Sequence, residues 1–194
     1  MTALPARRTV AGVRRKVRLA LVGVVLGAAC GRGPQGPDVG ALISQLKSTD
    51  PEARGKASLA IIRAGEPAVP GLIEMLKSED PQFRATAAST LFGLGPKARE
   101  AVPALADALS DSNPEMRASV AMALESIGPD SAPAVPALVR ALRDREGLVR
   151  QRAAIALGSI GPGARDAVPA LAEAARVDLV RPAAEEAIRK IQSR

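Results

Sequence analysis

Apolar and polar residues recur along this chain at a fixed interval. Val69, Val102, Val135 and Val168 are each followed by proline, and each lies 33 residues after the one before. A shorter copy of the pattern begins at Val39, 30 residues before Val69. A period of this size is typical of a solenoid, in which units of two helices stack on one another.

The first part of each copy has the spacing of an amphipathic helix. After Val135, for example, apolar residues follow at Leu138, Val139 and Leu142. Offsets of 3, 4 and 7 place these side chains on one face of a helix. The proline after each valine fits the first helical turn, because its missing N–H group would have no partner there.

The second part of each copy carries the signals of a helix start and a helix stop. Asp50, Asp80 and Asn113 are good N-terminal caps, and a proline follows each of them. The helix stops at a glycine in four copies, at Gly65, Gly95, Gly128 and Gly161. Small and branched apolar residues recur between these signals and are the predicted core. Two helices per copy and no strand pattern predict an all-α fold.

The second helix of the fourth copy reads VRQRAAIALGSIG. This stretch resembles the HEAT-like repeat of the phycobilisome-lyase type, and the resemblance recurs in register over residues 39–194. It implies a right-handed α-solenoid of about five two-helix repeats. Their expected ranges are 39–68, 69–101, 102–134, 135–167 and 168–194. In the fifth repeat Glu185 occupies a column of small residues, so we expect a C-terminal cap with a polar outer face.

The basic character of the chain lies in its first residues. The net charge is +7, but six of the 27 basic residues precede Cys30, where there is no acidic residue, which leaves 21 basic and 20 acidic residues. This basic stretch, the apolar run 19–29 and the single cysteine resemble a bacterial lipoprotein signal. We therefore expect a signal peptide over 1–29, lipid attachment at Cys30 and a Gly/Pro-rich tether over 30–38. Ordinary cleavage after Ala29 is the alternative.

The N-terminal resemblance also predicts a location. It implies export to the cell envelope, with the lipid holding the protein on the periplasmic face of a membrane. Gly31 after the cysteine favours the outer membrane over the inner one. The alternative is a soluble periplasmic or secreted protein.

Composition argues against several classes of function. The chain has no His and one Cys, so it lacks the residues that build zinc sites or the paired His–Glu iron sites of HEAT-like hydroxylases. Nearly balanced charge in the array and only two Phe disfavour nucleic-acid binding. We expect another protein as the partner, with no catalytic residue, cofactor, metal or small-molecule substrate. The alternative is a degenerate accessory protein, lyase-like or hydroxylase-like, that has or assists an enzymatic activity.

An arginine recurs near the start of each second helix, four residues after an acidic or amide residue. The pairs are Asp50 and Arg54, Asp80 and Arg84, Asn113 and Arg117, and Glu146 and Arg150. This spacing is typical of pairs on one helix face, and in HEAT proteins such residues form a polar ladder between repeats. We interpret the row as structural. Binding of a phosphate or a polyanion is the alternative.

The residues that vary within the second helices trace one helix face. They lie 17, 20 and 24 residues after each valine. In HEAT-like solenoids the second helix lines the concave surface, so stacked units would present these positions as one shallow groove. Apolar residues exposed there would suit a protein partner, and a merely solvated face is the alternative. The candidate contacts are Leu59, Arg63, Ser89, Met122, Ser126, Arg152, Ile155 and Ser159.

Overall fold

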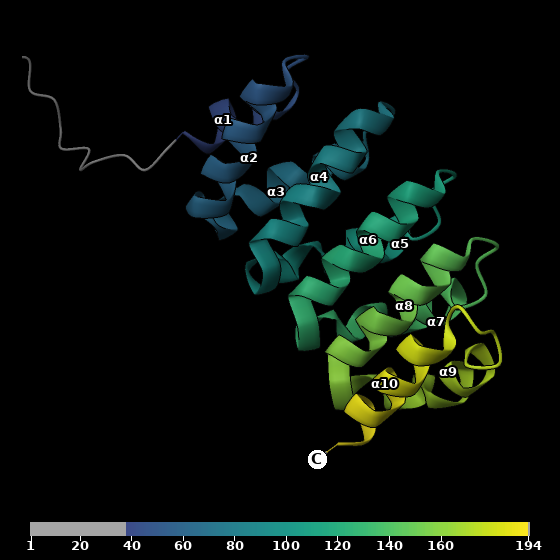
Figure 1. Ribbon diagram of the computed structural model, residues 1–194. Helices are drawn as coiled ribbons and strands as arrows, with labels where there is room; N and C mark the ends of the chain where they lie inside the picture. Colours follow the sequence, from purple (N-terminus) through teal and green to yellow (C-terminus); the bar gives the residue numbers. More distant parts are fainter. Residues whose placement is uncertain (1–37, 194) are drawn as a thin grey trace, which may run out of the picture. The chain divides into compact units, whose positions relative to one another are not determined.

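Five helix pairs follow one another along the chain (Figure 1). The computed structural model describes residues 38–193, in which every regular element is helical. The first helices are α1 (Val39–Leu46), α3 (Val69–Leu76), α5 (Val102–Ala108), α7 (Val135–Ala141) and α9 (Val168–Ala174). The second helices are α2 (Pro51–Ala64), α4 (Pro81–Leu94), α6 (Pro114–Ile127), α8 (Gly147–Ile160) and α10 (Arg181–Gln192). The all-α fold of repeated helix pairs is confirmed, and each recurring valine begins a first helix.

The second helices begin and end where the sequence predicts. The side chains of Asp50, Asp80 and Asn113 each accept a hydrogen bond from the backbone N–H two residues on, at 3.0, 2.8 and 2.8 Å. The stop glycines have positive φ angles of 79°, 56°, 75° and 69° at Gly65, Gly95, Gly128 and Gly161. Only glycine adopts this conformation at little steric cost, which explains why these stops are glycines.

A segment of 3₁₀ helix leads each of the first four second helices into the next repeat. It spans Gly95–Ala101, Gly128–Ala134 and Gly161–Ala167, but only Glu66–Ala68 in the shorter first copy. The Gly and Pro residues there interrupt the apolar period, so the sequence indicated only loops. Buried alanines such as Ala98 hold these segments against the core.

The helices form two layers, and the core lies between them. α4 packs against α6, α6 against α8 and α8 against α10, so the second helices make one continuous layer (Figure 1). Each second helix also packs on the first helix of its own pair. The predicted column of Ile61, Leu91, Leu124 and Leu157 is fully buried. Burial of such columns contributes about 25 cal/mol per Å² of apolar surface and holds the repeats together.

Small residues let neighbouring second helices approach closely. Gly158 in α8 lies against Ala187 in α10, and an ideal Cβ on Gly158 would lie 2.9 Å from the Cα atom of Ala187. Between α2 and α4, the hydroxyl groups of Ser58 and Thr90 are 3.1 Å apart and share a hydrogen bond. A larger side chain at either contact would push two helices apart.

The fifth pair keeps the register of the others although its loop is shorter. Arg181 donates from Nε to the carbonyl of Ala175, six residues upstream, as Arg117 donates from Nη1 to the carbonyl of Asp111. Glu185 is exposed. Ala88, Ala121 and Ala154, which hold the same column in earlier repeats, are buried.

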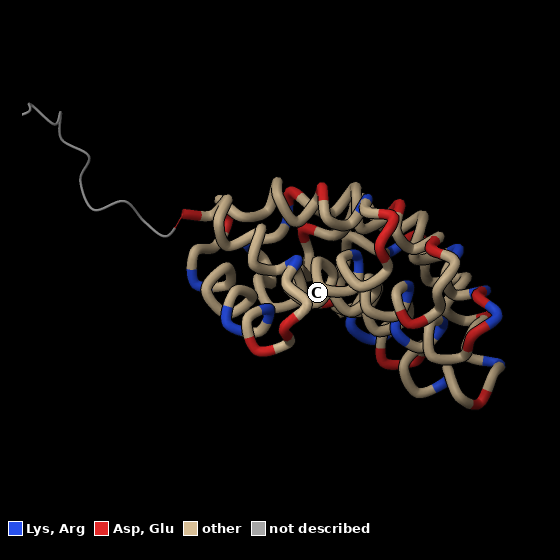
Figure 2. The backbone as a smooth tube through the Cα atoms, turned by 90° about the horizontal axis from the view of Figure 1, so that it is seen from above, with Lys and Arg blue, Asp and Glu red and all other residues tan. Residues whose placement is uncertain are grey.

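Both signs of charge are found along the whole row of helix pairs (Figure 2). Within residues 38–193, no helix is long and apolar enough to span a membrane. The predicted signal peptide over 1–29, the predicted lipid attachment at Cys30 and the tether up to Pro37 lie outside the described residues.

Candidate protein-binding surface

The eight candidate contact residues all reach the surface of the second-helix layer. Leu59, Arg63 and Ser89 are exposed, and Leu59 retains 57% of its accessible surface. The other five, in α6 and α8, are half-buried: Met122, Ser126, Arg152, Ile155 and Ser159. We call this set of positions the second-helix face.

A shallow hollow lies on this face between α4 and α6. It has a volume of about 70 Å³ and is lined by Ser89, Phe92, Ser119 and Met122. Phe92 was not among the sequence candidates, yet 44% of its surface is exposed. It follows Ser89 by three residues on the same helix face, and this spacing is the signal that could have found it.

A smaller hollow lies between α8 and α10. Its volume is about 40 Å³, and Ile155 forms part of its wall. Gly158 and Ala187 also line it, where the two helices approach closely, and Glu186 and Lys190 supply its polar groups. Met122 and Ile155 thus each border a recess into which an apolar side chain could fit.

The polar candidates differ in what they can offer a partner. The hydroxyl groups of Ser89 and Ser126 donate to backbone carbonyls of their own helices, at 3.2 and 2.8 Å. Arg152 has a buried Nε with no hydrogen-bond partner among the described residues. Arg63 lies exposed in the last turn of α2. Within residues 38–193 neither arginine forms an ion pair, so the outer nitrogens of their guanidinium groups are better candidates for polar contacts than Ser89 and Ser126.

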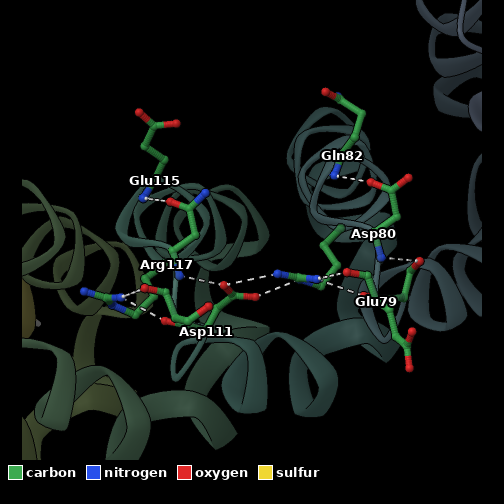
Figure 3. Close-up of polar contacts among 10 residues, drawn as sticks. Glu79, Asp80, Gln82, Asp111, Glu115 and Arg117 are labelled. Atoms are coloured by element: carbon green, nitrogen blue, oxygen red, sulfur yellow. Dashed lines mark hydrogen bonds and ion pairs between the residues drawn. The ribbon is translucent and has the colours of Figure 1, made fainter.

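Two arginines of the ladder bind carboxylates of the following repeat. Arg84 donates from Nε to Asp111 at 2.8 Å, and Figure 3 shows the carboxylate of Asp111 with its contacts as dashed lines. Arg117 donates from Nε and Nη2 to the two carboxylate oxygens of Asp144, at 2.7 and 2.8 Å. In both pairs the acceptor lies 27 residues after the arginine, in the loop before the next second helix. These contacts tie the second, third and fourth repeats to one another.

The predicted pairing of each arginine with the residue four positions upstream is not found in the structure. Asp50, Asp80 and Asn113 cap their own helices instead, and Glu146 makes no capping hydrogen bond with its side chain. A capping side chain turns toward the free N–H groups of the first turn, which aims it away from the arginine. The acceptors are Asp111 and Asp144, which the sequence candidates did not include.

Arg54 and Arg150 stand at the two ends of the ladder. Each donates from Nη1 to two carbonyls of its own loop, as Arg84 and Arg117 also do. Within residues 38–193, neither forms an ion pair with a carboxylate, and the Nε of Arg150 is buried without a partner. Two arginines of the ladder, Arg84 and Arg117, therefore form ion pairs with the next repeat, and two, Arg54 and Arg150, do not.

The sequence matches the HEAT repeats family over residues 39–108, 69–135 and 102–189, which together cover most of the chain. The chain belongs to the HEAT-repeat family. No curated protein sequence matches this HEAT-repeat chain.

Solved structures share its fold at low sequence identity. The complex of CpcE and CpcF of phycocyanin lyase from Nostoc sp. PCC7120 contains a chain that is 23% identical, with a TM-score of 0.64. That match covers 77% of this HEAT-repeat chain and 96% of the other. A designed armadillo repeat protein in complex with the peptide (KR)4 is 17% identical, with a TM-score of 0.62 and coverage of 79% and 82%. At such identities these similarities establish the solenoid fold alone.

The Arg117–Asp144 pair is the most fully bonded step of this HEAT-repeat ladder. The side chains are only 7% and 11% exposed. The hydrogen bond from Arg117 lowers the pKa of Asp144, against burial, which acts to raise it. The bond to Asp144 in turn raises the pKa of Arg117. Both groups are charged at neutral pH, so the two hydrogen bonds are charge-assisted.

Other features of the HEAT-repeat array offer less to a ligand. Within the described residues, no group of three or more His, Cys, Asp or Glu side chains is arranged to hold a metal ion. Two open hollows of about 300 and 430 Å³ lie over the first-helix layer, beside Leu76 and Ala104 and beside Val135 and Val139. Both are wide. The first is also lined by Lys77, Asp107, Ser110 and Asp111, of which Asp111 already binds Arg84, and the second has Asp166 as its charged residue.

Proposed function

We propose that this HEAT-repeat protein is an exported, lipid-anchored scaffold that binds a partner protein through its second-helix face. The observation that carries the proposal is the row of apolar side chains along that face. Leu59 and Phe92 are exposed, and Met122 and Ile155 border recesses between successive helices.

The chemistry of this face suits a protein partner. Aligned apolar side chains beside scattered cations and small polar groups are typical of protein interfaces, which are enriched in Met, aromatic residues and Arg. The designed armadillo protein with a similar fold is in complex with a peptide, which supports peptide binding by a solenoid of this kind. Arg63 and Arg152 would supply polar contacts at the two ends of the row.

Anchoring rests on the N-terminal sequence. A basic stretch, an apolar run and the motif LGAAC precede a Gly/Pro-rich segment, and Cys30 is the single cysteine in the chain. Multiple acylation of that cysteine would hold the protein stably on a membrane, whereas one acyl chain binds only weakly. We infer a mature protein that begins at Cys30, in the cell envelope, with the outer membrane as the favoured site.

The double substitution Met122→Asp and Ile155→Asp tests the binding face. It should abolish capture of the partner from the envelope fraction, because each carboxylate would replace an apolar side chain at the edge of a recess and would be desolvated by the partner. The matched control is Val139→Asp, which alters a half-buried apolar residue of the first-helix layer. Circular dichroism would establish that both variants keep their helices. Unchanged capture by the double variant would contradict the proposal.

Cys30→Ala tests the anchor. Labelling with a radioactive or clickable fatty acid should mark the wild-type protein and leave the variant unlabelled. Intact-mass measurement should give a mature chain that starts at Cys30 and carries acyl groups. An unlipidated chain with another start would contradict the anchor and leave the binding proposal standing.

The second candidate function is enzymatic or enzyme-assisting. It is supported by the phycocyanin lyase chain, nearly all of which is matched by this fold. Its test is to mix the purified protein with a bilin and measure the visible absorption spectrum. A shifted, protein-associated absorption band would favour this function, and an unchanged spectrum would argue against it.

A further inference from the structure

A corner between the fourth and fifth repeats gathers exposed apolar side chains. Of the five large apolar residues that are exposed within residues 38–193, three are here: Leu148, Val177 and Leu179, at 52%, 44% and 56%. Leu148 lies in the first turn of α8, and the other two lie in the loop between α9 and α10. Leu179 packs directly over Gly147, so the loop and the helix start share one patch.

This corner departs from the repeat pattern in two neighbouring repeats at once. The helices α2, α4 and α6 begin with proline followed by Glu52, Gln82 or Glu115, whereas α8 begins with Gly147 and Leu148. In the next loop, Val177 lies 27 residues after Arg150. That is the interval at which Arg84 and Arg117 find their carboxylates. The backbone N–H of Val177 also bonds to the carbonyl of Ala174, as that of Asp144 bonds to Ala141. An apolar residue therefore follows α9 at the position where an acid follows α7.

Within residues 38–193, the guanidinium group of Arg150 has no carboxylate partner. Its Nη1 bonds to two backbone carbonyls at 2.8 and 3.0 Å, but its Nε is buried with no partner in the described part of the chain. Its Nη2 lies 3.5 Å from the ideal Cβ position of Gly147, the same position that Leu179 covers. The Nη2 end of this guanidinium group therefore lies beside the apolar patch.

The surroundings of the corner carry more basic than acidic side chains, and two of its acids, Asp144 and Asp178, already pair with Arg117 and Arg181. Residues 140–193 contain ten basic and seven acidic side chains, whereas residues 38–139 contain nine basic and thirteen acidic ones. Arg143 and Arg145 are exposed in the loop that leads directly into Gly147. Neither forms an ion pair within residues 38–193. Charge complementarity therefore favours an acidic partner here.

We propose that this corner, formed by Leu148, Arg150, Val177 and Leu179, is a docking site for a partner protein segment that carries a carboxylate beside an apolar side chain. The carboxylate binds the guanidinium of Arg150 and forms the ion pair that Arg150 cannot form with Val177. The apolar side chain packs on Leu148 and Leu179. The site adjoins the second-helix face, because Leu148 lies four residues before Arg152 on α8, but none of its four residues belongs to that face. It does not depend on the function proposed for that face.

The first test asks whether Arg150 can take a carboxylate at this place. Val177→Asp should raise the melting temperature of the full chain relative to Val177→Asn, because only the charged side chain can form the missing ion pair. Both variants remove the same exposed valine, so their difference isolates the charge. Equal melting temperatures would overturn the proposal.

The second test uses random peptides displayed on phage, selected on the full chain and counter-selected on the double variant Leu148→Ser, Leu179→Ser. Both leucines are more than half exposed, so the variant should fold. Enriched peptides should carry Asp or Glu next to Leu, Ile or Phe. Affinity of an enriched peptide should fall about tenfold in Val177→Asp, where the new acid competes for Arg150.

A control variant separates this site from the second-helix face. Leu59→Ser removes an equally exposed leucine from that face and should leave the affinity of the enriched peptide unchanged. Enrichment of peptides without acidic residues would overturn the proposal. Loss of binding in Leu59→Ser would do so as well. Light scattering that shows a dimer dissociated by Leu148→Ser would also overturn it, since a second copy of the chain would then cover the patch.

Discussion

The guanidinium of Arg117 and the carboxylate of Asp144 meet through two hydrogen bonds, at 2.7 and 2.8 Å, across the boundary between two repeats. The same carboxylate accepts the backbone N–H of Glu146 at 2.9 Å, immediately before α8 begins. Arg117 also donates to the carbonyls of Asp111 and Ser112 in its own loop. One pair of side chains thus fixes two loops and the entry to a helix.

Arg117→Ala should lower the free energy of unfolding by about 3 kcal/mol, because it leaves a largely buried carboxylate without its cation. Partner binding should be largely unchanged at temperatures where the variant is folded. Lys56→Ala is the control, since it breaks an ion pair with Glu52 in which both side chains are 74% exposed. Its cost should be below about 0.5 kcal/mol. Equal losses in chemical denaturation of the two variants would contradict a structural role for the buried pair.

The pair also predicts a dependence of stability on pH. Because the folded protein has a lowered pKa at Asp144, this group contributes stability above its unfolded pKa of about 3.9, and the contribution is lost as the pH falls through the lower folded value. Asp144→Asn should be less stable than the wild type at neutral pH. It should lose less further stability on acidification below about pH 4. Urea unfolding at a series of pH values would measure both slopes, and parallel slopes would count against the assignment.

Asn113→Ala should cost about 1 kcal/mol, because the side chain of Asn113 accepts the N–H of Glu115 at 2.8 Å and caps α6. Glu146 occupies the same position before α8 but makes no capping bond with its side chain. Glu146→Ala should therefore change stability by only a few tenths of a kcal/mol. Thermal unfolding of the two variants would measure both changes. Equal losses of stability would show that the capping hydrogen bond of Asn113 is not the cause.

Two glycine substitutions should act in opposite directions. Gly158→Ala places a methyl group 2.9 Å from the backbone of Ala187 and should destabilise the protein by about 1–3 kcal/mol. Gly55→Ala, in the exposed part of α2 with nothing within 4 Å, should stabilise it by up to about 1 kcal/mol. Differential scanning calorimetry would separate them, and a stabilising Gly158→Ala would show that α8 and α10 can move apart at little cost.

Local signals were enough to predict the repeat and its helices. The caps at Asp50, Asp80 and Asn113, and the glycine stops, act within a few residues, so the sequence displays them directly. The recurring small and branched columns are buried because the repeat stacks identical faces on one another.

Contacts between repeats were harder to predict. Arg117 lies four residues after Asn113 and 27 residues before Asp144, and a sequence pattern favours the nearer residue. The side chain of Asn113 caps the helix and accepts a backbone N–H there, so it is not the partner of Arg117. The arginine instead reaches Asp144 in the next loop. Phe92 was missed for a similar reason, because its column holds Ile62, Glu125 and Gly158 in other repeats and shows no common character.

Ion pairs between repeats are unevenly distributed along the array. Arg84 and Arg117 link the second, third and fourth repeats, whereas Arg54 and Arg150 form no ion pair that would link the first and the fifth repeats to their neighbours. Local opening should therefore start at the ends, with amide hydrogens of α1, α2 and α10 exchanging faster than those of α4, α6 and α8. A partner whose carboxylate binds Arg150 would hold the fifth repeat against the fourth. Binding should therefore slow amide exchange in α10 and make the array more rigid.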